Sequence, residues 1–128
     1  MLVNRTAYGD KPAFSVQINH KDVYTGIPDN DRALTIRKFS EIVSMEDARD
    51  KMVKDFYIPG HVFLLISRGL ENRRGHTELA TELAKLAGMQ ETMVLCEMLG
   101  SGKALSKNKA KEYAEKNKLV FIEGKELV

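Results

Sequence analysis

The chain has 128 residues, a length typical of one domain, and 43% of them are hydrophobic and 30% charged, as in a globular protein. A net charge of +2 is too small to indicate nucleic-acid binding by electrostatics alone, so that function is disfavoured. We expect neither a secretory signal nor a membrane span, because no apolar run approaches the roughly 20 residues that cross a bilayer. A cytoplasmic protein is the expectation.

The first part of the chain predicts a hairpin followed by helical structure. Residues 13–19 alternate apolar and polar side chains, as in a half-buried strand, and residues 23–25 are typical of a short returning strand. His20 lies in the turn between them and is expected to be exposed. Residues 29–42 offer three N-caps followed by apolar residues at helical spacing, which predicts a helix. The stretch 44–55 is ambiguous between a short helix and a loop.

The second part predicts buried strands and two more helices. Pro59-Gly60 is a turn signal, and the continuous apolar run 62–66 is typical of a strand buried on both faces. A helix is expected to begin at Thr77 and to end at Gly88. Two further strands and a charged helix are expected over 92–98, 119–122 and 106–118. Strands and helices mix without strict alternation, which indicates a single α+β or α/β domain over residues 1–128.

One polar segment lies where a loop enters the helix that begins at Thr77. Backbone N–H groups at a helix N-terminus attract anions, and the guanidinium groups of Arg73 and Arg74 match phosphate oxygens. Gly75 would let a ligand approach the backbone closely, and Thr77 could either cap the helix or bond a phosphate. These residues suggest a phosphate site with His76 beside it as a metal ligand or proton carrier. The alternative is a capped surface helix with solvated arginines.

Two other side chains could carry acid–base chemistry. Glu97 lies in an apolar strand, where burial would suit a general acid or base, or it is a strand-end residue that faces solvent. His61 begins an apolar strand and is either a reactive group or a hydrogen-bonded structural histidine. The single cysteine, Cys96, has no partner for an internal disulfide, and its apolar neighbours favour a small buried residue. Together with the phosphate segment, these residues suggest acid–base chemistry on a small phosphorylated compound.

Four segments occur in the order and near the spacing of a known enzyme family: 25–32, 59–63, 73–78 and 95–98. From about Pro12 to the C-terminus the chain resembles 3,4-dihydroxy-2-butanone-4-phosphate synthases, in particular their archaeal-type members. The resemblance covers the C-terminal part of the family pattern. The family's N-terminal half carries an acidic loop that supplies another metal ligand, and nothing in residues 1–13 resembles it.

The resemblance implies an α+β fold, with a mixed sheet and flanking helices. It also implies a lyase of riboflavin biosynthesis that converts ribulose 5-phosphate to 3,4-dihydroxy-2-butanone 4-phosphate and formate, with Mg²⁺ or Mn²⁺ as cofactor. The expected partners are the sugar phosphate and a second subunit of a homodimer, with no nucleic acid and no membrane. The alternative is a truncated, non-catalytic homologue that binds phosphate or serves as an assembly module.

The resemblance also implies a role for each matching residue. The substrate phosphate would be held at the helix N-terminus by Arg73, Arg74, Gly75, His76 and Thr77. His76 would in addition be a metal ligand, while Thr25 and Asp31 would line the substrate site. Glu97 would bind substrate hydroxyls and move protons, and His61 would be its acid–base partner in catalysis.

Overall fold

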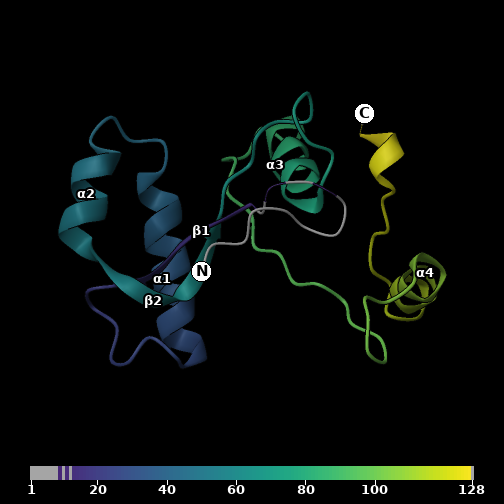
Figure 1. Ribbon diagram of the computed structural model, residues 1–128, viewed down its shortest axis with the longest axis horizontal. Coiled ribbons are helices and arrows are strands. Elements are labelled where there is room, and N and C mark those ends of the chain that lie inside the picture. Colours follow the sequence, from purple (N-terminus) through teal and green to yellow (C-terminus); the bar gives the residue numbers. More distant parts are fainter. Residues whose placement is uncertain (1–8, 10, 12, 128) are drawn as a thin grey trace.

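A computed structural model describes residues 9, 11 and 13–127, and its fold is α+β. A two-stranded antiparallel sheet is accompanied by four α-helices and one 3₁₀ turn. The elements are β1 (Phe14–His20), α1 (Asp29–Ile42), α2 (Ala48–Asp55), β2 (Phe56–Leu65), α3 (His76–Leu86), α4 (Lys107–Lys116) and η1 (Gly124–Glu126). Figure 1 shows α1 and α2 beside one end of the sheet, with α3 and then α4 beyond its other end.

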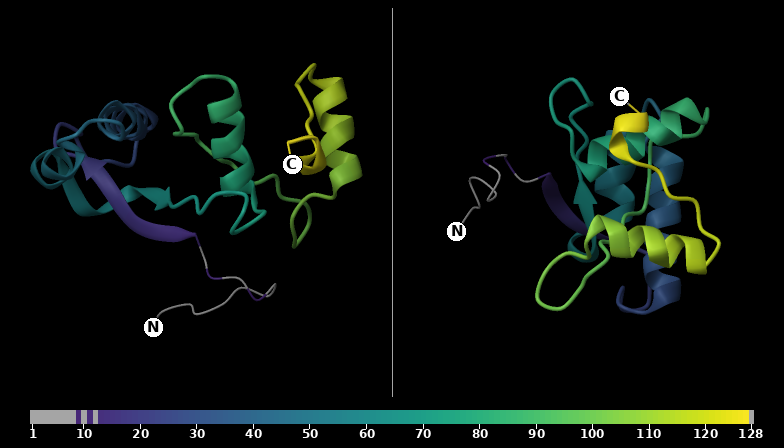
Figure 2. Two further views of the ribbon diagram at one scale, coloured as in Figure 1. Left: turned by 90° about the horizontal axis from the view of Figure 1, so that it is seen from above. Right: turned by 90° about the vertical axis from the view of Figure 1, so that its right-hand side faces the viewer.

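The packed core lies between the sheet and the first two helices. Ile18 of β1 is fully buried, and it contacts Ile42 at the end of α1 and Phe56 at the start of β2. The Phe39 ring of α1 meets the Phe56 ring edge to face, at 6.2 Å between centroids. In Figure 2 α3 and α4 lie away from this core, joined to it and to each other by long irregular segments. The sheet, α1 and α2 therefore form the framework from which the remaining chain extends.

The middle of β2 is interrupted by a wide bulge. Ile18 pairs with Val62, but the next residue of β1, Asn19, pairs with Tyr57, so residues 58–61 are left unpaired between them. Gly60 within this bulge lies against β1, where an alanine Cβ would be only 1.9 Å from the carbonyl carbon of Ile18. The expected turn at Pro59-Gly60 is therefore a bulge inside one strand.

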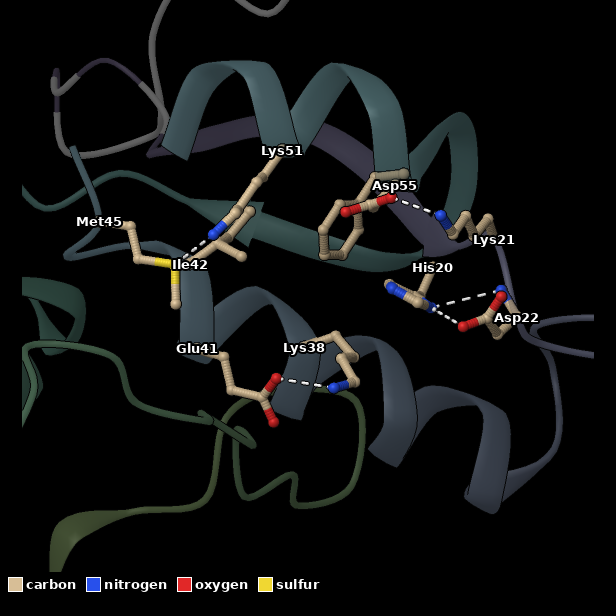
Figure 3. Close-up of a pocket in the computed structure, with 10 residues that line it drawn as sticks. His20, Lys21, Asp22, Lys38, Glu41, Ile42, Met45, Lys51 and Asp55 are labelled. Carbon is tan, nitrogen blue, oxygen red and sulfur yellow. Dashed lines mark hydrogen bonds and ion pairs between the residues drawn. The ribbon is translucent and has the colours of Figure 1, made fainter. Parts of the chain in front are cut away.

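The expected hairpin around His20 is wrong in two respects. Residues 23–25 form a loop, and the partner of β1 is β2, more than 30 residues further along the chain. His20 is only 5% exposed, because it ends β1 inside the core instead of lying in a turn. Its ring packs edge to face on Phe56, and its Nδ1 accepts the backbone N–H of Asp22 at 3.3 Å (Figure 3).

The strands expected over 92–98 and 119–122 are also absent from the described part of the chain, and the sheet is antiparallel rather than mixed. Both segments run as irregular backbone, and residues 98–105 hold only an isolated bridge between Leu99 and Ala104. A strand needs a neighbour that supplies hydrogen bonds, and no neighbour pairs with either segment in the structure. Cys96 is consequently exposed instead of buried.

Three helix predictions are confirmed to within two residues at each end. α1 ends at Ile42 as expected, but its N-cap is Pro28, so the expected capping residues 29–31 lie inside its first turn. α3 begins one residue before Thr77, and α4 covers most of 106–118. Gly88 ends α3 as expected: its φ of +65° suits glycine, and its N–H donates to the carbonyl of Lys85. Among the described residues, every helix is too short or too polar to cross a bilayer.

Candidate functional site

The loop before α3 is folded around the carboxylate of Glu78. This side chain lies in the first turn of α3, and the residue is only 1% exposed. Its Oε2 accepts a hydrogen bond from Arg73 Nη1 at 2.6 Å and one from the backbone N–H of Gly75 at 3.2 Å. Its Oε1 accepts the backbone N–H of Arg68 at 3.3 Å. One buried carboxylate therefore joins the beginning and the end of the loop.

Gly75 is the N-cap of α3, and its missing side chain leaves room for an arginine. An alanine Cβ at this position would lie 2.1 Å from Arg73 Nη1. Thr77 is buried inside the first turn, so the alternative that it caps the helix is wrong. A hydrogen bond from Thr77 to a phosphate stays a prediction. Arg74 is exposed, as a solvated arginine would be.

Two opposing effects act on the pKa of Glu78. Burial raises this pKa, because it penalises the charged form, whereas the hydrogen bonds from Arg73 and the backbone lower it. The hydrogen bonds prevail, and the pKa of Glu78 lies below the ordinary glutamate value of 4.5. The ionised carboxylate is thus the form that the fold stabilises.

We expect this ion pair to make folding stability depend on pH in the acid range. Because the pKa of Glu78 is lower in the folded chain than in the unfolded one, its contribution is complete above about pH 4.5 and is lost as the pH falls through the folded value. Urea unfolding between pH 3 and 6 should therefore show a shallower acid decline for Glu78→Gln than for the wild type. Glu112→Gln, on exposed α4, removes the same charge and should keep the wild-type slope. Equal slopes for all three proteins would contradict the assignment.

His61 is exposed on the bulge of β2 and is held there by Asn19. The side-chain Oδ1 of Asn19 accepts the backbone N–H of His61 at 2.9 Å. The ring Nδ1 of His61 lies 3.1 Å from Asn19 Nδ2 and 3.3 Å from Asn19 Oδ1. The structure therefore confirms that this histidine is hydrogen-bonded, and it leaves the residue exposed to solvent. Its role as a reactive group stays a prediction.

A wide hollow with a mostly apolar wall brings most of the expected site residues together. Its wall includes parts of β2, α1 and α3, the segment 91–98 and the chain after α4. The expected site residues that line it are His61, Arg73, His76, Thr77 and Glu97. Glu97 is exposed there, so the expectation that it is buried is wrong. It faces solvent as the alternative predicted, but from irregular backbone and not from the end of a strand. Arg74, Gly75, Thr25 and Asp31 are not among the lining residues of this hollow.

Asp31 has a local structural role at the start of α1. Its Oδ2 accepts the backbone N–H groups of Gly26 at 2.8 Å and of Thr25 at 2.9 Å, and these bonds lower the pKa of Asp31. Gly26 has a φ of +90°, and the space beside it is taken by the Asn19 side chain. The turn that carries Thr25 is thereby hydrogen-bonded to α1, and it lies against Asn19, the residue that holds His61. Contact of Thr25 or Asp31 with a substrate stays a prediction.

The described residues do not assemble a complete site for a divalent cation. His76 and Glu97 line the same hollow, but no group of three or more His, Cys, Asp or Glu side chains in this part of the chain could hold a metal ion. Mg²⁺ takes six ligands, nearly all oxygen. The residues present therefore do not fit the expected cofactor by themselves.

A second pocket lies between β1, α1 and α2, and its charges are already paired. Lys21 contacts Asp55 at 2.6 Å, and Lys38 contacts Glu41 at 2.8 Å (Figure 3). Lys51 contacts Asp47 at 3.3 Å. Each lysine on this pocket has a carboxylate partner, so the pocket offers little net attraction for an anion.

Two residues that organise the site, Glu78 and Asn19, have no role that the sequence predicted. Glu78 stands three residues after the N-cap Gly75, which is the spacing of a capping box, so a local signal was available. Asn19 gave no such signal, because its partner His61 is 42 residues away.

Comparison with known proteins agrees with the resemblance of the four segments. The sequence model of the 3,4-dihydroxy-2-butanone 4-phosphate synthase family matches residues 1–128. A 3,4-dihydroxy-2-butanone 4-phosphate synthase of Methanosarcina mazei is 50% identical over 127 residues, covering 94% of this chain and 51% of the relative. A 3,4-dihydroxy-2-butanone 4-phosphate synthase of Archaeoglobus fulgidus is 43% identical over 127 residues, covering 94% of this chain and 53% of the relative.

The architecture also matches a solved structure. The crystal structure of RibBX, a two-domain 3,4-dihydroxy-2-butanone 4-phosphate synthase from A. baumannii, aligns with a TM-score of 0.73 and 28% identity. The alignment covers 93% of this chain and 34% of RibBX. The chain spans about half the length of the archaeal relatives that it matches.

Proposed function

The chain belongs to the 3,4-dihydroxy-2-butanone 4-phosphate synthase family, and we propose that it carries the substrate-binding and proton-transfer residues of such a synthase. The reaction would be the conversion of ribulose 5-phosphate to 3,4-dihydroxy-2-butanone 4-phosphate and formate, a lyase step of riboflavin biosynthesis. The observation that most supports this function is the single hollow lined by His61, Arg73, His76, Thr77 and Glu97. A homologue from Bacillus velezensis that is 34% identical is named as the riboflavin biosynthesis protein RibBA.

The start of α3 would bind the substrate phosphate. The first N–H groups of a helix have no partner within that helix, and the helix dipole adds positive potential there. Arg73 adds a cationic side chain that lines the hollow beside His76 and Thr77. Arg74 and Gly75 complete the proposed phosphate segment, one as an exposed cation and the other as the N-cap.

His61 and Glu97 would move protons at the sugar carbons. Loss of formate from a ketose phosphate requires enolisation, and proton transfer by positioned side chains promotes such steps at adjacent carbons. The imidazole of His61 is held by Asn19 yet exposed, and the carboxylate of Glu97 is exposed in the same hollow. Both groups are therefore accessible to a bound sugar. Thr25 and Asp31 would contact the substrate from the turn before α1.

The proposal also includes a metal cofactor, a homodimeric assembly and a cytoplasmic location. A divalent cation, Mg²⁺ or Mn²⁺, would take His76 as one ligand, and it would need oxygen ligands that the described residues do not gather. The functional assembly would be a cytoplasmic homodimer that acts on a small sugar phosphate. A gel-filtration mass of twice 14.4 kDa would support the dimer.

The direct test is formate release from ribulose 5-phosphate with Mg²⁺. The chain should be assayed alone at high concentration, and again with the remaining half of the Methanosarcina mazei relative added as a separate polypeptide. We expect formate release in at least one of the two assays, and we expect EDTA to abolish that release. Absence of formate in both assays, with the added half shown to bind the chain, would contradict the proposed activity.

A further inference from the structure

We propose that Glu78 is a positioning residue, whose buried carboxylate fixes the guanidinium of Arg73 for binding the substrate phosphate. The inference rests on the proposed function, and it assigns a role to a residue that does not line the hollow itself. Glu78 acts here through Arg73, because its own side chain is fully buried and has no surface on which to meet a substrate.

The hydrogen bonds of Glu78 secure the loop at both ends. The backbone N–H of Arg68 donates to Oε1, and the backbone N–H of Gly75 donates to Oε2. Between these points the backbone N–H of Arg73 donates to the carbonyl of Gly69 at 3.0 Å. The main chain of Arg73 is thus fixed by the loop, and its side chain is fixed by the same carboxylate that closes the loop.

The contact with Glu78 also orients the guanidinium. A guanidinium is planar and rigid, so a short bond at Nη1 restricts the directions in which its other N–H groups can point. Gly75 lacks the side chain that would otherwise occupy the position of Nη1. Because Arg73 lines the hollow and its side chain keeps 21% exposure, the oriented group reaches the place where the phosphate is proposed to bind.

A positioning role and a purely electrostatic effect predict opposite results. Glu78 carries a negative charge close to the proposed anion site, so removal of the charge alone should strengthen phosphate binding. Loss of the oriented Arg73 should weaken it. The sign of the change in affinity for Glu78→Gln therefore distinguishes the two roles, since glutamine keeps the shape of the side chain and removes its charge.

A double-mutant cycle on the full chain tests the coupling. Inorganic phosphate is titrated into the wild type, Glu78→Gln, Arg73→Ala and the double variant, and the amide signals of His76 and Thr77 are followed by NMR. Glu78→Gln should weaken binding about tenfold in the wild-type background, as expected for a lost charge-assisted hydrogen bond. In the Arg73→Ala background the same change should alter affinity by less than about twofold.

Glu82→Gln is the matched control for charge. Glu82 lies one turn further along α3 and contacts Lys85 at 3.8 Å, so the change removes a negative charge from the same helix without touching Arg73. It should leave phosphate binding unchanged or slightly stronger. Circular dichroism of each variant checks that α3 and the rest of the fold are retained.

Four outcomes decide the matter. The positioning role alone would be overturned if Glu78→Gln bound phosphate as tightly as the wild type. It would also be overturned if Glu78→Gln lowered the phosphate affinity equally in the presence and in the absence of Arg73. A wild-type chain that binds neither inorganic phosphate nor ribulose 5-phosphate would overturn this role and the proposed phosphate site together. If Glu78→Gln does not fold, NMR of the wild type still tests the proposal. A guanidinium of Arg73 that is held in place shows separate, slowly exchanging Nη signals. Signals of a freely rotating guanidinium would contradict the proposal.

Discussion

Replacement of Gly60 by alanine should destabilise the chain by about 3 kcal/mol or more. The new Cβ would lie 1.9 Å from the carbonyl carbon of Ile18 and 2.3 Å from the backbone nitrogen of Asn19. Both are backbone atoms of β1, so relief of the clash requires the two strands to separate at the bulge. Ile18 is the fully buried centre of the core, and the separation would therefore expose the most protected apolar contact of the framework. Urea unfolding followed by circular dichroism measures the loss.

The matched control is Gly100→Ala. A Cβ at that position would have the carbonyl oxygen of Lys103 as its nearest neighbour at 3.5 Å, which is an ordinary van der Waals distance. We expect a change within about 1 kcal/mol there. Equal stability of the two variants would show that β1 does not approach Gly60 as closely as the structure has it. It would also contradict the close packing of the bulge, which carries His61, against β1.

Three of the four helices were predictable because their signals are local, whereas the sequence left α2 ambiguous between a helix and a loop. α1 carries apolar residues at helical spacing, and α3 ends where Gly88 adopts a positive φ. Strand pairing was not predictable in the same way. The alternation over 13–19 indicated a strand, but the choice of β2 as partner depends on contacts between residues more than 30 positions apart. The apolar segments 92–98 and 119–122 show the same limit, since an apolar pattern favours a strand without providing its neighbour.

In the candidate site, too, the residues that are neighbours in the sequence were predictable as a group, and those brought together by the fold were not. Arg73, His76 and Thr77 lie together because they are consecutive at a helix start, and a local reading of the sequence was enough to group them. His61 and Glu97 join them only through the tertiary structure, and the resemblance to a family was what connected them beforehand. The roles of Asn19 and Glu78 became visible only with the hydrogen bonds that they make. Residues that position others are the part of a site that sequence patterns describe least.

Substitution of either proposed proton carrier should abolish most of the formate release and spare phosphate binding. In the preparation that releases formate, His61→Ala and Glu97→Gln should each lower kcat about a hundredfold or more, because a positioned acid or base contributes a factor of that order. The affinity for inorganic phosphate should stay within about twofold, since the phosphate is proposed to bind at the start of α3. Initial rates of formate production and the NMR titration of phosphate provide the two measurements.

This pattern separates an enzyme from a homologue that only binds phosphate. A binding module would lose nothing measurable in either variant, whereas Arg73→Ala would weaken phosphate binding in both cases and so does not discriminate. Glu112→Gln, on the exposed surface of α4 and outside the hollow, controls for loss of a carboxylate and should keep the wild-type rate. His61→Ala retains a backbone N–H for Asn19, so a stable variant with a lost rate assigns the loss to the imidazole. Full activity in both His61→Ala and Glu97→Gln would place the proton transfers on other residues and refute the proposed acid–base pair.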